Sequence, residues 1–125
     1  RTSMKALLLI AHGSRRQQSN NEVVVLAEKL KNNSVGQYDI IHAGFLELAE
    51  TLIPDGIKKC VDDGATSIVV LPYFLNSGRH VIEDIPEIVN ATKPLYPQAD
   101  IKIAPHVGAS ELMMELLIMS ANSTR

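Results

Sequence analysis

Histidines, arginines and carboxylates suited to metal or acid–base chemistry occur in short segments spread along the 125-residue chain. The segment HGSRR begins at His12, directly after an apolar run, LELAE contains Glu47, and LNSGRH ends at His80. An imidazole ionises near neutral pH, so it can accept a proton or bind a metal ion. Two imidazoles and one carboxylate, here those of His12, His80 and Glu47, suit borderline divalent metals and leave coordination positions open for a substrate.

Each of these residues also has a purely structural interpretation. His12 can be a strand-end histidine that is hydrogen-bonded to the backbone, and Glu47 can be an ordinary solvated carboxylate. His80 and Asp84 are four residues apart, so on a helix they share one face and can form a surface pair. If His80 binds a metal ion, Asp84 can instead orient its imidazole through the second ring nitrogen.

Other charged and titratable residues are weaker candidates. Arg15, Arg16 and Arg79 flank the same segments, and arginine pairs bidentately with carboxylates and phosphates, although solvated surface cations are as common. His106 follows a short apolar run and is an auxiliary candidate. His42 lies within an apolar run, which favours packing against a sheet.

The elements that must position these residues are four apolar segments that alternate with helical patterns. Continuous apolar strands of this kind are typical of a parallel sheet that is covered on both faces. With right-handed crossovers, the pattern predicts a single α/β domain over residues 1–125, an open, doubly wound, four-stranded parallel sheet with helices on both faces. The expected strands are 5–12, 38–46, 66–73 and 100–104, and the expected helices are 22–30, 54–63, a segment from about 79 to 89, and 110–119.

This topology brings the candidate residues together. In an open parallel sheet, the carboxyl ends of all strands meet at one edge, and ligands bind in the crevice beyond them. His12, His80 and His106 each follow a different expected strand, so three of the four histidines should lie at this edge.

Local signals predict how several elements begin and pack. Residues 13–21 have the composition of a polar loop, and Asn20 or Asn21 is expected to cap the first helix. Asn32–Ser34 and Gly36 should end that helix. Ser110 is expected to cap the last, amphipathic helix, whose methionines, Met113, Met114 and Met119, are most simply explained by helix packing.

Composition excludes several classes of function. The net charge of −2 argues against broad binding to nucleic acid or to an anionic membrane. The chain has a single cysteine, Cys60, which excludes zinc and iron–sulfur sites that need several cysteines. Cys60 lies among apolar residues of an expected helix, where a reactive thiolate is not expected. A single cysteine also fits a reduced, cytoplasmic location. The chain contains no GxGxxG, GxxxxGK[ST] or GxSxG motif and no apolar run long enough to cross a membrane, and no leader is expected.

Three blocks of sequence resemble a known family. LLLIAHGSRR at 7–16, FLELAE at 45–50 and, most specifically, GATSIVVLPYFLNSGRHVIEDIP at 64–86 are similar to the small CbiX/SirB-type sirohydrochlorin chelatases, the class II chelatases. The resemblance extends over nearly the whole chain and implies a chelatase-like fold. It also implies a homodimer, because longer relatives look like two such units in tandem.

The resemblance assigns roles to individual residues. It implies that His12, His80 and Glu47 hold the metal and carry the catalytic chemistry. It places the tetrapyrrole against the loop Leu75, Asn76, Ser77, Gly78 and Arg79, with Glu50 and Arg15 nearby. Glu50-Thr51-Leu52 and His106 depart from the family's usual residues, which bears on the identity of the substrate.

The resulting functional hypothesis is insertion of a divalent metal, cobalt first, with nickel or iron as alternatives, into a sirohydrochlorin-like tetrapyrrole for cobalamin or sirohaem synthesis. No organic cofactor is expected. The runner-up is a protein that binds or delivers a metal or tetrapyrrole without catalysis. A hydrolase using His12 as a phosphate acceptor is a weaker alternative, because it needs an arginine before the histidine, where Ala11 stands.

Overall fold

A four-stranded parallel sheet forms the centre of the computed structural model, which describes residues 3–33 and 37–124. The strand order is β2-β1-β3-β4, and all three neighbouring pairs are parallel. The expected open parallel sheet is therefore confirmed, with strand ends that differ from the expectation by two residues at most. The strands are β1 (Lys5–Ala11), β2 (Ile40–Phe45), β3 (Ser67–Pro72) and β4 (Asp100–Ile103).

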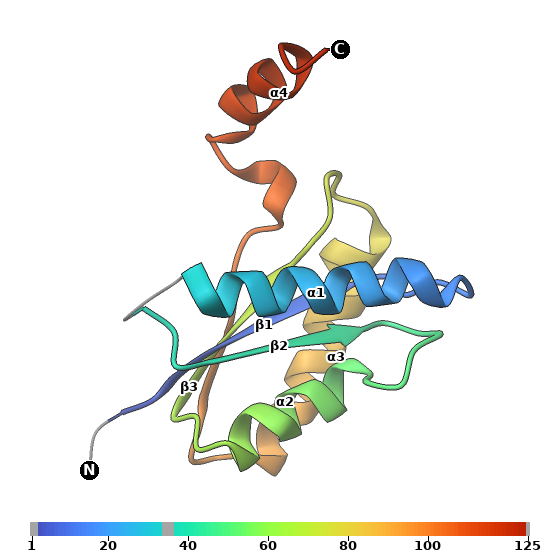
Figure 1. The fold of residues 1–125 in the computed structure, drawn as a ribbon. Helices are drawn as coiled ribbons and strands as arrows, with labels where there is room; N and C mark the ends of the chain where they lie inside the picture. Colours follow the sequence, from blue (N-terminus) through green and yellow to red (C-terminus); the bar gives the residue numbers. More distant parts are fainter. Residues whose placement is uncertain (1–2, 34–36, 125) are drawn as a thin grey trace.

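Helices cover the two faces of this sheet, as the sequence predicts (Figure 1). The helix α1 (Gln17–Asn33) packs on one face, where Leu7, Leu9 and Ala27 form a buried cluster. The helices α2 (Ile53–Asp62) and α3 (Ile85–Thr92) pack on the other face, against the alternate side chains of the same strands. Short helical turns, η1 (His80–Asp84), η2 (Lys93–Leu95) and η3 (Val107–Ala109), and a last helix, α4 (Met113–Ala121), complete the described chain.

The strand β1 explains why this arrangement is stable. From Ala6 to Ala11 each side chain is buried, because β1 lies between β2 and β3 and has helices on both of its faces. The connection from β1 leads to α1 on one face, whereas the connection from β3 leads to α3 on the other. The gap between the carboxyl ends of β1 and β3 is therefore the point at which the chain's winding reverses, where open α/β sheets bind ligands.

The expected start of the first helix is wrong. Residues 17–21 were expected to be loop, but α1 already begins at Gln17, and Asn20 lies inside the helix rather than capping it. Asn20 is buried and uses its amide for hydrogen bonds to two loops, a role that local composition does not reveal. The helix ends at Asn33, and the expected stop signals at 34 and 36 lie outside the described residues.

The last helix also differs from the expectation. It begins at Met113 rather than Ser110, and it packs against neither face of the sheet (Figure 1). Met114 and Met119 are 72% and 70% exposed, so the expected packing is wrong for these two methionines, whereas Met113 is half-buried. Ser110 does act locally, because its hydroxyl accepts a hydrogen bond from the Leu112 N–H at 3.1 Å. No helix in the described ranges has the length and apolar character needed to cross a membrane.

Candidate active site

The first part of the site lies where β1 and β2 end side by side. His12 follows β1, and its Nε2 lies 3.1 Å from Oε2 of Glu47 in the loop after β2. The backbones of the same two residues are also joined, because the Glu47 N–H donates to the His12 carbonyl oxygen at 3.1 Å. Because a carboxylate can only accept a hydrogen bond, the proton of a neutral His12 lies on Nε2, which leaves Nδ1 with a free lone pair.

Glycine at position 13 makes this close approach possible. Gly13 has a φ of +97°, a left-handed conformation that side chains disfavour, and a Cβ atom there would collide with the carbonyl oxygen of Glu47. The facing loop is strained as well, because Leu48 adopts a φ of +58° without being glycine. Backbone strain of this kind is concentrated at functional sites.

Asn20 fastens both loops to α1, and the sequence analysis missed this role. Its Oδ1 accepts a hydrogen bond from the Ser14 N–H, and its Nδ2 donates to the carbonyl oxygens of Ser14 and Leu48, each at 2.9 Å. One buried amide thus holds the loop after β1 and the loop after β2 in a fixed relation. The only sequence signal was an amide residue at the start of a helix, which is more typical of a cap.

The second part of the site is the π-helical turn η1, which begins with His80. Nδ1 of His80 lies 2.6 Å from Oδ2 of Asp84, so the pair expected from the four-residue spacing is present. The carboxylate accepts the Nδ1–H, and Nε2 of His80 is left with its lone pair free. A ligating histidine commonly has such a partner, which sets its tautomer and its ring orientation.

The two parts meet. The rings of His12 and His80 are in edge-to-face contact, with centroids 4.5 Å apart and planes inclined by 77°. The side chains of His12, Glu47 and His80 are 46%, 58% and 44% exposed, so a large ligand can reach all three. The histidines lie at the carboxyl ends of β1 and β3, the point where the winding reverses, as the topology predicts.

The described residues form small cavities but no ready-made metal site. Across residues 3–33 and 37–124, no three histidine, cysteine, aspartate or glutamate side chains are arranged to hold a metal ion together. One cavity of about 240 Å³ is lined by Glu50 together with residues of α1, and another of about 280 Å³ is lined by Tyr73, Phe74 and Leu75. The first cavity lies between α1 and the loop after β2, and the second lies at the loop after β3; neither is lined by His12, Glu47 or His80.

Comparison with known proteins decides the family. A family model described as CbiX matches residues 6–124, which is nearly the whole chain. The chain belongs to the CbiX family.

Curated relatives and a solved structure agree with this assignment. The CbiX-family chain is 45% identical over 86 residues to a sirohydrochlorin cobaltochelatase of Methanococcus maripaludis, covering 69% of this chain and 58% of the relative. It is 32% identical over 121 residues to a sirohydrochlorin ferrochelatase of Priestia megaterium, covering 97% of this chain and 45% of the relative. The structure of the sirohydrochlorin chelatase SirB from Bacillus subtilis subspecies spizizenii in complex with cobalt superimposes with a TM-score of 0.83 and 29% identity, over 95% of this chain and 50% of SirB. The chain thus spans about half the length of these proteins.

The residues expected to contact a substrate are exposed around the histidines of this CbiX-family chain. Leu75 is 66% exposed, and the Arg79 side chain is 81% exposed, with its Nε 3.4 Å from Oε2 of Glu83. Arg15 and Glu50 are also exposed, as are the loop residues Asn76, Ser77 and Gly78. The structure places these residues on the loops after β1, β2 and β3, and their contacts with a substrate stay a prediction.

Two other titratable residues, His42 and Cys60, have structural roles in the fold. His42 on β2 is half-buried, and its Nε2 lies 2.7 Å from Oδ2 of Asp63 at the end of α2, which agrees with the packing role expected for it. Cys60 is buried in α2, and burial raises the pKa of its thiol to about 12, with a smaller contribution from the Asp63 carboxylate. The Cys60 thiol is therefore protonated at neutral pH, as the sequence led us to expect.

Proposed function

We propose that this CbiX-family chain inserts a divalent metal ion into a sirohydrochlorin-type tetrapyrrole. The observation that carries the proposal is the contact between the His12 and His80 rings, which come from different strand ends and meet beside Glu47. The names of its cobaltochelatase and ferrochelatase relatives support the class of reaction. We propose cobalt as the first metal to test, because the cobaltochelatase relative is the more similar of the two, and nickel and iron as alternatives.

The chemistry needs few groups. A pyrrole macrocycle must lose two N–H protons and gain one divalent cation. Nδ1 of His12 and Nε2 of His80 carry the free lone pairs of two half-exposed side chains, and Glu47 supplies a negative charge beside His12. In our proposal these three side chains hold the incoming cation weakly enough to release it, with the Glu47 carboxylate turning from Nε2 of His12 toward the ion. When the cation passes to the macrocycle, the imidazoles of His12 and His80 regain their lone pairs, and each accepts one of the two displaced protons. Imidazole and carboxylate ligands suit borderline metals such as cobalt, nickel and iron.

The exposed arginines have a role in the same proposal. Sirohydrochlorin-type macrocycles carry many carboxylates, and arginine pairs with carboxylates bidentately. Arg15 and Arg79 are exposed on the loops that follow β1 and β3, the loops that lead to the histidine pair, so in our proposal they bind the rim of a macrocycle whose centre faces the imidazoles. We further propose that the chain works as a homodimer, which agrees with its spanning half the length of SirB.

The experiment is a metal-insertion assay followed by absorbance, with purified protein, sirohydrochlorin, and Co²⁺, Ni²⁺ and Fe²⁺ in parallel. We expect His12→Ala and His80→Ala to fold but to lower the rate about 100-fold or more, a typical contribution of acid–base catalysis. His42→Ala is the matched control, because that imidazole pairs with Asp63 away from the site. Full activity in either site variant contradicts the proposal. Metallated product that stops at one equivalent points instead to a binding or delivery protein.

A further inference from the structure

The two imidazoles of the candidate site are paired with different carboxylates and through different ring nitrogens. Glu47 contacts Nε2 of His12 at 3.1 Å, whereas Asp84 contacts Nδ1 of His80 at 2.6 Å. Because a carboxylate only accepts hydrogen bonds, each one selects the tautomer of its ring and leaves the opposite nitrogen with a lone pair. The two pairs differ in how firmly the carboxylate is held.

The backbone around Asp84 is anchored in the core. The turn η1 is closed by a π-helical hydrogen bond from the Ile85 N–H to the carbonyl oxygen of His80, which joins the histidine directly to the residue after Asp84. Ile85 is fully buried in the core cluster, and Pro86 follows it in the first turn of α3. Single π-helical turns are rare and frequently occur at functional sites. Asp84 is therefore held against His80 by a turn that the core keeps in place.

The side chain of Glu47 has more freedom than that of Asp84. It is 58% exposed, against 37% for Asp84, and it extends from a loop that belongs to no helix or strand. It also contains one more rotatable bond, and its contact with His12 is the longer of the two. A long, exposed carboxylate can turn toward an arriving cation, whereas the shorter and more buried one stays with its imidazole.

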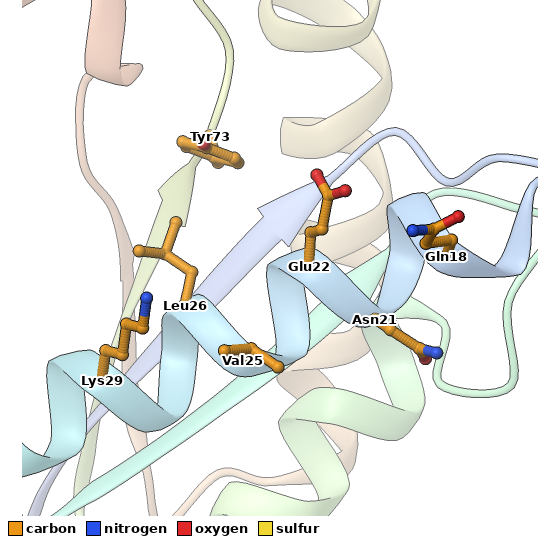
Figure 2. Close-up of a pocket in the computed structure, with 7 residues that line it drawn as sticks. All are labelled: Gln18, Asn21, Glu22, Val25, Leu26, Lys29 and Tyr73. Carbon is orange, nitrogen blue, oxygen red and sulfur yellow. The ribbon is translucent and has the colours of Figure 1, made fainter.

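The walls of a cavity do not position the two rings. A groove of about 410 Å³ runs along α1, and Figure 2 shows Glu22 of that helix and Tyr73 at the end of β3 beside it. Neither histidine lines this groove, and neither of their carboxylates does. The orientation of the imidazoles therefore depends on their own hydrogen-bond partners, and for His80 that partner is Asp84.

We infer that Asp84 is a positioning residue for metal capture. It keeps the proton of His80 on Nδ1, so that Nε2 is the nitrogen that meets the cation and, after transfer of the cation, takes up a displaced proton. His80 with Asp84 is then the fixed half of the site, and His12 with Glu47 is the half that rearranges when the cation arrives. The inference rests on the proposed function for the identity of the cation.

The first test needs no macrocycle. Long-range ¹H–¹⁵N NMR at a pH where imidazoles are neutral reports the tautomer of each histidine, and calorimetry with Co²⁺ alone reports the affinity for the metal. In the original protein, His80 should be a single Nδ1–H tautomer. Asp84→Ala should show both tautomers and bind Co²⁺ about 10-fold more weakly or worse, the usual effect of removing the partner of a ligating histidine. Asp84→Asn should lie between the two, because an amide can either accept or donate.

A second measurement separates the two halves of the site. Zn²⁺ is diamagnetic and takes imidazole and carboxylate ligands, so it can replace Co²⁺ in the NMR experiment. When Zn²⁺ binds, the Nδ1–H of His80 should stay protected from exchange with water, since Asp84 continues to accept it. The Nε2–H of His12 should exchange faster, because Glu47 turns toward the ion. The reverse pattern, or equal exchange at both rings, would overturn the division into a fixed half and a half that rearranges.

Glu83→Gln is the matched control for the Asp84 variants. Glu83 belongs to the same turn, but its carboxylate lies 3.4 Å from Nε of Arg79 and pairs with that guanidinium instead of a histidine. The control should leave the His80 tautomer and the Co²⁺ affinity unchanged, and an equal loss in it would overturn the inference. A single His80 tautomer in Asp84→Ala, or unchanged binding of Co²⁺, would overturn it as well. A merely structural role would lower the free energy of unfolding and leave the tautomer of the folded protein unchanged.

These outcomes are independent of the proposed metal insertion. The NMR and calorimetric measurements use the protein and a metal ion only, so they decide the role of Asp84 even if the insertion assay shows no turnover. Conversely, a failed test of Asp84 leaves the insertion assay with the His12 and His80 variants as a separate test of the proposed function.

Discussion

At the scale of single residues, the site depends on how closely two backbone segments approach each other. His12 and Glu47 are joined by a backbone hydrogen bond and by a side-chain contact, both at 3.1 Å, and this double link requires a residue without a Cβ atom at position 13. The glycine is thus a structural condition for placing the imidazole, although it contributes no chemistry itself.

Gly13→Ala tests this condition. The substitution adds a side chain at a φ of +97° and drives it into the Glu47 carbonyl, so we expect a loss of about 2 kcal/mol or more in the free energy of unfolding, from strain and steric overlap. Gly78→Ala is the matched control, because no atom lies within 4 Å of its added Cβ. Urea unfolding measures both, and equal stability of the two variants would contradict the interpretation.

At the scale of elements, α1 is both a layer of the fold and the support of the site. Its buried Asn20 holds the loops that carry His12 and Glu47, through three hydrogen bonds of 2.9 Å. A buried amide that makes this many bonds is costly to remove, because its partners lose their hydrogen bonds in a place that water reaches poorly.

Asn20→Ala should therefore destabilise the protein by about 2–3 kcal/mol, since it leaves the Ser14 and Leu48 backbone groups without their partner. Metal insertion should fall further than the unfolded fraction alone explains, because the loops also lose their fixed spacing. Asn21→Ala is the control, since Asn21 is exposed and shares one side-chain bond with Gln17. Chemical denaturation and the insertion assay, run on the same samples, separate the two effects. A stable Asn20→Ala variant would exclude this role.

The elements also show where prediction from sequence succeeds and fails. β1 and β3 were predictable because continuous apolar runs of this length are typical of strands in parallel sheets. The approach of His12 to His80 followed from the rule that ligands bind where the winding reverses. The start of α1 was not predictable, because a polar helix turn exposed to solvent has the composition of a loop. The exposure of α4 was not predictable either, because an apolar face shows that a helix must dock but not on which surface.

At the scale of the whole molecule, the core that holds the sheet and α2 together contains an ionisable group. Cys60 is fully buried among apolar residues that include Ile57 and Ile68. Burial, with a smaller effect of the Asp63 carboxylate, raises the pKa of this thiol from 9.0 to about 12. The folded state therefore keeps the thiol protonated under conditions in which the unfolded chain releases the proton.

Because the pKa of Cys60 is higher in the folded state than in the unfolded state, the protein should lose stability as the pH rises. Below pH 9 both states hold the proton, and the contribution of Cys60 to stability is fully present. Between pH 9 and 12 only the unfolded state ionises, so the free energy of unfolding should fall by up to about 1.4 kcal/mol for each pH unit. Cys60→Ala removes this titration and leaves the lysines and tyrosines unchanged. The stability difference between the original protein and the variant should therefore narrow as the pH rises from 8 to 11 in urea titrations. A difference that stays constant over this range would show that the thiol ionises equally in both states and that the core around α2 admits water, and a difference that widens would show that the folded state ionises first.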